Sequence, residues 1–443
     1  MKGRFFVACG ALVLGAAAAC TASGDDPTAD PSLPDADAGQ TVVPTLEAGA
    51  AEVDASDDAE VDAGKIVDAG DDPPAVGPVC SPAGWCATAL PATDLLMKAM
   101  YPLAGRAFVA AESPTLGVKL LEWDEATAKW SYIDDGSQNV LGRWAGGLWA
   151  PNENELYVGI SPNFIYHGTR ANPGAAFTWT RQAIGASTNA DDGHVLYTKR
   201  DLGARVPSLG VWGTSTGDVY AWFKHQIFHL TSVGGAEPEW VREYSVDDRD
   251  NAAETSYFFA AAGTGSDDVW FAGARTRGTG GCALLVRKTA AGYERIADGR
   301  FTGTFTFTCN QPRPDTLYIG GTEGWLTDIE VTGPDEVIAL KGARDVVKVS
   351  RVDDAYSYVA APVPTQVTAK GLNSLATVNG DLWLGGAGLI VRGTSVWDGG
   401  SFAVSTAALN GLPLNSAVYQ VKGTSNSNLW AIGVRHALHK TTP

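Results

Sequence analysis

Basic residues are scarce in this 443-residue chain. There are 32 Lys and Arg against 50 Asp and Glu, which gives a formal net charge of −18. Because a nucleic-acid binder needs a basic face, nucleic acid is excluded as a partner. Histidine is also scarce, with six residues, and the chain has no P-loop and no dinucleotide fingerprint followed by a helix. We therefore predict no cofactor, no metal and no catalytic residue.

Long apolar runs are limited to the N-terminus. The run Phe5–Ala19 follows Lys2 and Arg4, and it is too short to span a bilayer comfortably. It ends in Ala17-Ala18-Ala19-Cys20, which resembles a bacterial lipobox. The resemblance implies that residues 1–20 form a lipoprotein signal peptide with its lipidation site, and that Cys20 is lipidated and becomes the N-terminus after cleavage in front of it. The alternative is an ordinary signal peptide cleaved after an A-x-A site.

Aromatic residues are absent from residues 21–79, which contain fifteen acidic residues and one basic residue, Lys65. Such a segment cannot bury enough apolar surface to offset the entropy of ordering, and its like charges repel one another. We predict a disordered Asp/Ala/Pro-rich tether. With a lipid on Cys20, the protein is expected to be exported and anchored to the bacterial cell envelope, with the outer membrane as the expected site.

The rest of the chain repeats one pattern: a polar turn, an acidic residue and an apolar-aromatic strand. Clear copies are Asp268-Val269-Trp270-Phe271-Ala272-Gly273 and Asp381-Leu382-Trp383-Leu384-Gly385. The first apolar residue of each copy serves as an anchor. The seven anchors are Phe108, Leu156, Val219, Val269, Val337, Leu382 and Leu429. Their spacings run from 45 to 68 residues, and the two longest leave room for inserted surface loops.

Each copy contains several short strands. Third strands follow the anchors, as in Phe164-Ile165-Tyr166, and tryptophans mark candidate fourth strands at Trp130, Trp179, Trp240 and Trp397. Four short antiparallel strands at a period near 50 residues predict propeller blades. The last copy stops after Ala437-Leu438-His439, so the segment around Gly84-Trp85 is expected to supply its fourth strand. We predict an all-β propeller over residues 80–443 with seven four-stranded blades, within a range of six to eight.

These repeats resemble those of secreted lipoproteins from myxobacteria, in which a V-W-G…D-V-W-x-x-G unit follows a signal peptide and an acidic spacer. The segment from Cys80 to Cys86 resembles the cysteine-bounded segment that opens such propellers. The resemblance implies a propeller and carries no activity, because the function of that family is mostly unknown.

Four cysteines lie in the predicted propeller: Cys80, Cys86, Cys282 and Cys309. Four cysteines allow three pairings. Because exported thiols tend to oxidise, we favour two disulfides, Cys80 with Cys86 and Cys282 with Cys309, over a metal site.

Histidines and carboxylates recur at fixed places in the repeat. His167, His229 and His439 follow their anchors by ten or eleven residues, where another copy has Arg392. A position that recurs in every blade is selected by the blade, so we predict a structural role at the end of the third strand. The acids before the anchors, such as Asp218 and Asp268, are interpreted as turn formers that hydrogen-bond their own backbone.

The sequence thus favours a non-enzymatic, monomeric binding or scaffold module for a protein or glycan ligand. This interpretation is based on the repeat architecture, in which no set of candidate catalytic residues departs from the repeated pattern. The alternative is a carbohydrate-active enzyme, similar to a glycosidase, with its site in the central channel. A lectin with aromatic pockets on several blades is a third hypothesis. The fold by itself does not decide among them.

Overall fold

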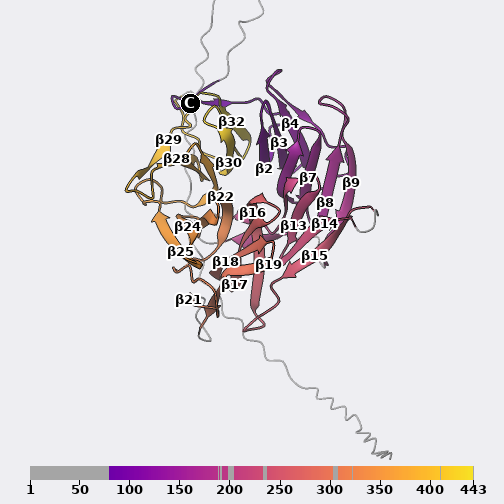
Figure 1. The fold of residues 1–443 in the computed structure, drawn as a ribbon. Helices are drawn as coiled ribbons and strands as arrows, with labels where there is room; N and C mark the ends of the chain where they lie inside the picture. The colour runs from indigo at the N-terminus through magenta and orange to yellow at the C-terminus, as the bar shows by residue number, and fades with distance from the viewer. Residues whose placement is uncertain are drawn as a thin grey trace, which may run out of the picture. The chain divides into compact units, whose positions relative to one another are not determined.

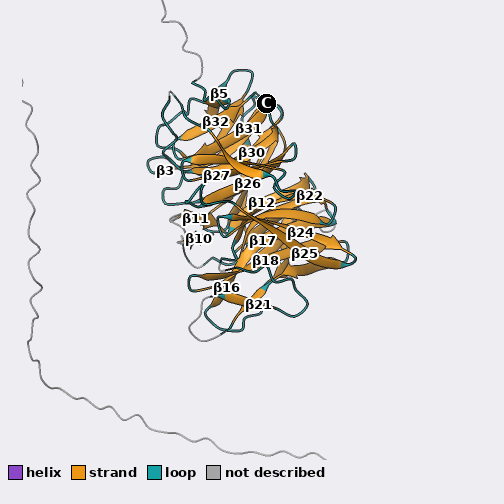
Figure 2. Cartoon of the chain, turned by 90° about the vertical axis from the view of Figure 1, so that its left-hand side faces the viewer, coloured by secondary structure: helices purple, strands orange, loops and turns teal. Residues whose placement is uncertain are grey.

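The computed structural model describes residues 79–187, 189, 192–197, 204–232, 237–302, 308–321, 323–409 and 411–442. Every helix or strand in these ranges is a β-strand (Figure 2). No helix in this part of the chain is long and apolar enough to cross a membrane. Residues 1–20 with Cys20, and residues 21–78, lie outside the described residues, so the signal, the lipid anchor and the tether stay predictions.

Seven four-stranded antiparallel sheets are arranged in a ring (Figure 1), which confirms the predicted seven-bladed propeller. Each sheet is a blade, and the blades are numbered along the chain. Blades 1 to 4 are β2 (Leu96–Leu103), β3 (Arg106–Ser113), β4 (Gly117–Asp124) and β5 (Lys129–Tyr132); β6 (Ala145–Asn152), β7 (Glu155–Ile160), β8 (Phe164–Thr169) and β9 (Thr178–Ala183); β12 (Leu209–Ser215), β13 (Asp218–Phe223), β14 (Gln226–Thr231) and β15 (Glu239–Ser245); and β16 (Glu254–Gly265), β17 (Asp268–Arg277), β18 (Gly280–Thr289) and β19 (Gly292–Ala297).

The remaining blades include the one that closes the ring. Blades 5 to 7 are β22 (Leu326–Gly333), β23 (Glu336–Lys341), β24 (Asp345–Val352) and β25 (Ala355–Pro362); β26 (Leu372–Val378), β27 (Asp381–Gly386), β28 (Leu389–Thr394) and β29 (Ser401–Ser405); and β30 (Val418–Ser425), β31 (Asn428–Gly433), β32 (His436–Lys440) and β1 (Trp85–Ala87). β1 pairs with β32, with Trp85 opposite Lys440. The first strand of the domain therefore completes the last blade, which leaves no open gap in the ring.

The first strand of each blade lies against the first strands of both neighbouring blades, so these seven inner strands surround the central channel. The second strands are apolar on both faces, because each blade packs between two others. In β17, for example, Val269, Trp270 and Phe271 are all fully buried. Trp270 packs with Ile329 and Val347 of the next blade. The core is thus a series of layers between blades.

Two hairpins are added to the repeat, at the two longest anchor spacings. β10 (His194–Tyr197) pairs with β11 (Ala204–Pro207) between blades 2 and 3, at one side of the blades in Figure 2. β20 (Gly299–Phe301) pairs with β21 (Cys309–Pro312) between blades 4 and 5. Both were expected as insertions. One fourth strand was misplaced: Trp397 lies in the turn before β29, because the chain turns there over Ser395–Gly400.

Candidate functional site in the central channel

The central channel contains a cavity of about 800 Å³. Residues from all seven inner strands line it, together with His194, Val206 and Pro207 of the β10–β11 hairpin. Val195 and Val206 of this hairpin pack against Phe259 of blade 4. The hairpin therefore extends from blades 2 and 3 to blade 4 and covers part of the cavity. A volume of this size suits a small ligand or a short segment of a larger one.

Lys422 joins three blades across the channel. It lies on β30 of blade 7, and its Nζ is 2.6 Å from Glu330 Oε1 and 3.4 Å from Asp328 Oδ1 on β22 of blade 5. It also donates to the carbonyl of Leu375 in blade 6, at 3.1 Å. Burial alone would lower the pKa of Lys422, but the charges of Asp328 and Glu330 raise it above its ordinary value. Burial raises the pKa of Glu330, and Lys422 opposes that rise.

A second charged pair lies in the same cavity. Lys98 Nζ is 3.4 Å from Glu112 Oε2 and 4.3 Å from the centre of the Tyr419 ring. Glu112 also accepts a hydrogen bond of 3.0 Å from the backbone N–H of Ala145 in the next blade. The carboxylates of this cavity that we describe, Glu112, Asp328 and Glu330, thus each contact a lysine.

Side chains of three inner strands hold the next blade by its backbone. Asp328 Oδ2 accepts from the N–H of Leu375 at 2.9 Å, and Ser374 Oγ accepts from the N–H of Val421 at 2.8 Å. Gln420 Oε1 accepts from the N–H of Met100 at 2.6 Å. These acceptors stand at the same register in blades 5, 6 and 7. The inner strands of those three blades and blade 1 are therefore connected by hydrogen bonds across the channel wall.

The four cysteines of the propeller form two disulfides, Cys80–Cys86 and Cys282–Cys309. This confirms the favoured pairing, and the alternative of a thiolate metal site is wrong. Cys86 lies in the closing strand β1, and the second disulfide links β18 of blade 4 to β21 of the inserted hairpin. Within the described ranges, no group of three or more His, Cys, Asp or Glu side chains could hold a metal ion.

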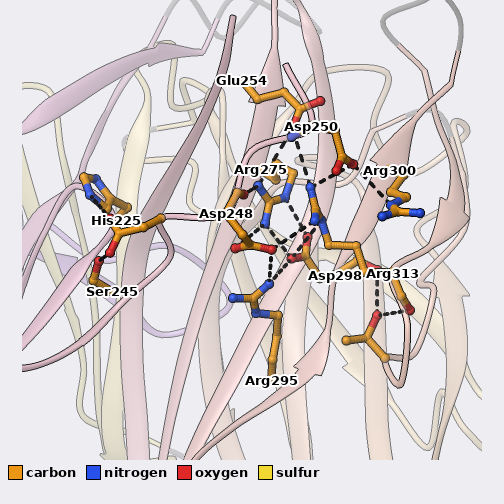
Figure 3. Close-up of polar contacts among 12 residues, drawn as sticks. His225, Ser245, Asp248, Asp250, Glu254, Arg275, Arg295, Asp298, Arg300 and Arg313 are labelled. Carbon is orange, nitrogen blue, oxygen red and sulfur yellow. Dashed lines mark hydrogen bonds and ion pairs between the residues drawn. The ribbon is translucent and has the colours of Figure 1, made fainter. Parts of the chain in front are cut away.

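A second polar cluster joins the β20–β21 hairpin to blade 4 (Figure 3). Asp248, in the link from blade 3 to blade 4, is 2.9 Å from both Arg295 and Arg313. Arg275 makes a two-pronged pair with Asp298, at 3.0 and 2.8 Å, and both side chains are fully buried. Partial burial alone would raise the pKa of Asp248, but the hydrogen bond from Arg295 and the charges of Arg275 and Arg313 lower it to about 2.

Charges of opposite sign are balanced within this second cluster. Its members are Arg275, Arg295, Arg300 and Arg313 with Asp248, Asp250, Glu254 and Asp298. Four cations face four carboxylates, so the cluster offers little net charge to a ligand. Because its arginines come from blade 4 and the hairpin, we assign it the structural role of holding the insertion in place.

The recurring histidines and acids form one structural network in each blade. In blade 3, His229 Nε2 lies 2.9 Å from Asp218 Oδ1. The imidazole stacks on Tyr220, with ring centroids 4.3 Å apart and an interplanar angle of 3°. The structural role predicted for the histidine agrees with this geometry. Two details of the prediction were wrong: the histidine lies inside β14, and Asp218 binds a side chain of the third strand.

The other blades repeat this contact with different residues. The sets, each written as second-strand polar residue, second-strand apolar residue and third-strand residue, are Glu155, Tyr157 and His167; Asp268, Trp270 and Arg287; Glu336, Ile338 and Lys348; Asp381, Trp383 and Arg392; and Asn428, Trp430 and His439. Blade 1 reverses the charges, with Arg106 Nη1 at 2.6 Å from Glu122 Oε1. This register makes Ala107, opposite Pro102, the equivalent of the other anchors and moves the expected anchor Phe108 by one residue.

One sequence motif that is typical of serine hydrolases was overlooked in the sequence analysis. Gly213-Thr214-Ser215-Thr216-Gly217 has the G-x-S-x-G pattern of a nucleophile elbow. An elbow needs a strand followed by a helix, whereas these residues end β12 and turn into the antiparallel strand β13. The pattern here therefore belongs to a hairpin of blade 3.

Comparison with known proteins supports the fold. No protein-family model matches the chain, and no curated protein matches it. Among solved structures, YCF48 from Cyanidioschyzon merolae is similar with a TM-score of 0.51 at 11% identity, over 80% of this chain and 98% of that one. The RRP9 WD40 repeats give 0.50 at 10%, over 81% and 98%. YCF48 bound to D1 peptide gives 0.50 at 12%, over 83% and 99%. The chain thus belongs to the structural class of β-propellers, and at these identities the likeness shows the fold alone.

Proposed function

We propose that this chain is a non-enzymatic binding or scaffold module of the bacterial cell envelope, held by a lipid on Cys20 and an acidic tether. Its ligand is a protein, and its binding site is the central channel. The observation that carries the proposal is the cavity of about 800 Å³, which all seven blades line and in which Lys98 and Lys422 pair with the carboxylates that we describe.

The balance of charge supports binding over hydrolysis. A general acid and a general base must exchange protons with a substrate, and a carboxylate held by a lysine and a backbone N–H is a poor proton acceptor. Asp328 is held in this way by Lys422 and Leu375. One neighbour of similar fold, YCF48, carries a peptide in its solved structure, and this supports a peptide or protein ligand for the present propeller.

Crosslinking in intact cells tests this proposal. The tagged full-length protein is crosslinked briefly and recovered, and a Cys20→Ser variant serves as the matched control for the anchor. We expect one protein partner in stoichiometric amount with the lipidated protein, and reduced recovery of that partner with Cys20→Ser. Recovery of glycan alone, or of no reproducible partner, would contradict the proposal.

A carbohydrate-active enzyme is the second candidate function, and one observation favours it. Asp328 and Glu330 lie in the same channel on one strand, and burial raises the pKa of Glu330, as is typical of a general acid. Hydrolysis of a panel of polysaccharides by the wild-type protein and by Glu330→Gln tests it. Turnover that disappears in Glu330→Gln would favour this function over the first.

A further inference from the structure

The cavity of the central channel holds more carboxylates than lysines among the described residues. Three carboxylates and two lysines line it: Glu112, Asp328, Glu330, Lys98 and Lys422. Lys98 pairs with Glu112, whereas Lys422 is shared by Asp328 and Glu330. The group around Lys422 therefore keeps one negative charge that no cation of the described residues neutralises.

Glu330 carries a carboxylate oxygen that is open to the cavity. Both oxygens of Asp328 accept hydrogen bonds, Oδ1 from the N–H of Ile329 and Oδ2 from the N–H of Leu375. Glu330 Oε1 accepts from Lys422 at 2.6 Å, whereas Oε2 is not a fully buried atom and has no hydrogen-bond partner among the described residues. The Glu330 side chain is 28% exposed and lines the cavity, so a ligand there can reach Oε2.

Two aromatic side chains line the cavity at the level of Glu330. Tyr101 lies on β2 and Trp212 on β12, at the register that Glu330 has on β22, where each residue lies opposite the one that follows the anchor of its blade. Both side chains are half-buried and line the cavity. Burial raises the pKa of the Tyr101 phenol, and the negative charge of Glu330 acts in the same direction. The phenol therefore lies near this carboxylate.

A carboxylate and aromatic rings at one level of a cavity are suited to an organic cation. The carboxylate accepts charge-assisted hydrogen bonds, and the faces of the rings attract positive charge. An anionic ligand at this level would meet the negative charge of Glu330. Lys422 cannot compensate for that, because an ammonium group has three N–H donors and those of Lys422 contact Asp328, Glu330 and the carbonyl of Leu375.

We propose that the central channel binds a lysine or arginine side chain of the partner protein, with Glu330 Oε2 as its acceptor, at the level of Tyr101 and Trp212. This inference rests on the proposed protein-binding function and names the chemistry of the ligand. A cavity of about 800 Å³ accommodates such a side chain together with the backbone that carries it. The bound cation neutralises the charge that Lys422 leaves on Asp328 and Glu330.

The test uses a phage-displayed library of random twelve-residue peptides, selected on the full-length protein. A synthetic peptide of residues 21–79 is present in excess, because its fifteen acidic residues attract basic peptides that do not enter the channel. We expect the enriched peptides to share a lysine or arginine at one position. These peptides are synthesised, and their affinity for the full-length protein is measured by fluorescence anisotropy.

Two variants of the protein separate the channel from its net charge. Glu330→Gln keeps the shape of the side chain and removes its charge, and we expect it to weaken binding about 10-fold. Glu239→Gln is the matched control, because it removes the same charge from an exposed position on the outer strand β15. We expect this control to change affinity by less than about 2-fold. Unfolding midpoints of both variants show whether each is folded.

A change in the peptide completes a double-mutant cycle. The shared lysine is replaced by norleucine, or a shared arginine by citrulline, which removes the positive charge and keeps the length of the side chain. We expect this change to weaken binding to the wild-type protein about 10-fold and binding to Glu330→Gln by less than about 3-fold. The difference between the two losses measures the contact between the cation and Glu330.

Two results would overturn the inference. The first is that no peptide is enriched, or that the enriched peptides share no basic residue. The second is that Glu330→Gln and Glu239→Gln bind the enriched peptides equally well. If the cellular partner is captured equally by wild type and Glu330→Gln, the inference fails while the proposed function stands. If wild type captures no protein, the proposed function fails, and the inference fails with it.

Discussion

The second and third strands of the blades, which we call the blade bodies, and the inner strands that form the channel wall share one seven-fold backbone. They differ in how strictly their side chains repeat from blade to blade. Between the second and third strands, six blades place a polar residue, an apolar residue and a basic residue at one register, and blade 1 makes the same ion pair with its charges reversed. At the channel wall, one register holds polar acceptors in three blades and Ala or Gly in four. A contact present in every blade serves the fold. A feature that only some blades have at this register is not required by the fold, so it can serve another role such as binding.

The largest expected effect falls on a blade body. Trp270 is fully buried between blades 4 and 5, so Trp270→Ala leaves a cavity and should lower the free energy of unfolding by about 3–5 kcal/mol. Urea unfolding measures it. Trp179→Ala is the control and should lose less, because Trp179 is only half-buried on the otherwise exposed outer strand β9. Equal losses at the two sites would show that burial between blades does not give Trp270 a larger contribution to stability.

The next effect falls on the channel wall. Lys422→Met leaves Asp328 and Glu330 facing each other without a cation, and it should cost about 2–4 kcal/mol at neutral pH. The variant should regain stability as the pH falls, because Glu330, whose pKa burial already raises, takes up a proton in the folded state before it does so in the unfolded state.

The wild-type protein should lose stability at high pH. The pKa of Lys422 is raised in the folded state, so its stabilisation is complete below its ordinary value of 10.5 and is lost as the pH rises through the folded value. Thermal unfolding midpoints from pH 7 down to 5 measure the first behaviour, and midpoints above pH 10.5 measure the beginning of the second. A variant whose midpoint does not rise on acidification would show that the two carboxylates do not repel each other.

A smaller effect tests whether the orientation of the repeated ion pair matters. Asp381→Arg brings two cations together in blade 6 and should cost about 1–2 kcal/mol. Adding Arg392→Asp restores the pair with reversed charges, as blade 1 has it in Arg106 and Glu122, and should recover most of the loss. A double-mutant cycle by urea unfolding gives the coupling. If the double variant is no more stable than Asp381→Arg, the orientation is specific to each blade.

The smallest expected effect on stability belongs to Ala99→Ser. The wall accepts Ser374 at the same register in blade 6, so the free energy of unfolding should change by less than about 0.5 kcal/mol. Urea unfolding measures the change. A loss above about 2 kcal/mol would show that blade 1 cannot adopt the side-chain pattern of blade 6.

Sequence patterns predicted the propeller well because a blade is local. Each anchor such as Val269 begins a strand whose apolar residues must be buried on both faces, and turns of two or three residues separate that strand from its neighbours. The segment around Trp85 was expected to close the ring because the last repeat ended one strand short. The favoured pairing of Cys282 with Cys309 is confirmed, but the disulfide links blade 4 to the inserted hairpin, whereas we expected it to join strands of that blade.

The contacts of the candidate site could not be predicted from such local sequence patterns. Lys422 stands 92 residues from Glu330, and only the closed ring brings their side chains to 2.6 Å. The acids before the anchors were interpreted as turn formers because a turn is the local use of Asp218, whereas its partner His229 lies on the neighbouring strand. The contrast along the channel wall also depends on register, since a β-bulge lies just before this register in the inner strands of six blades, whereas the bulge of blade 3 lies at the other end of its strand, between Gly213 and Ser215.

The sequence by itself therefore determined the class of fold, and it favoured seven blades and the observed cysteine pairs, since short-range alternation and repeat spacing contain that information. Only the tertiary structure decided which charges neutralise one another and which side chains of one blade bond to the backbone of the next. Those properties depend on distances between residues of different blades, and such distances exist only once the ring has closed.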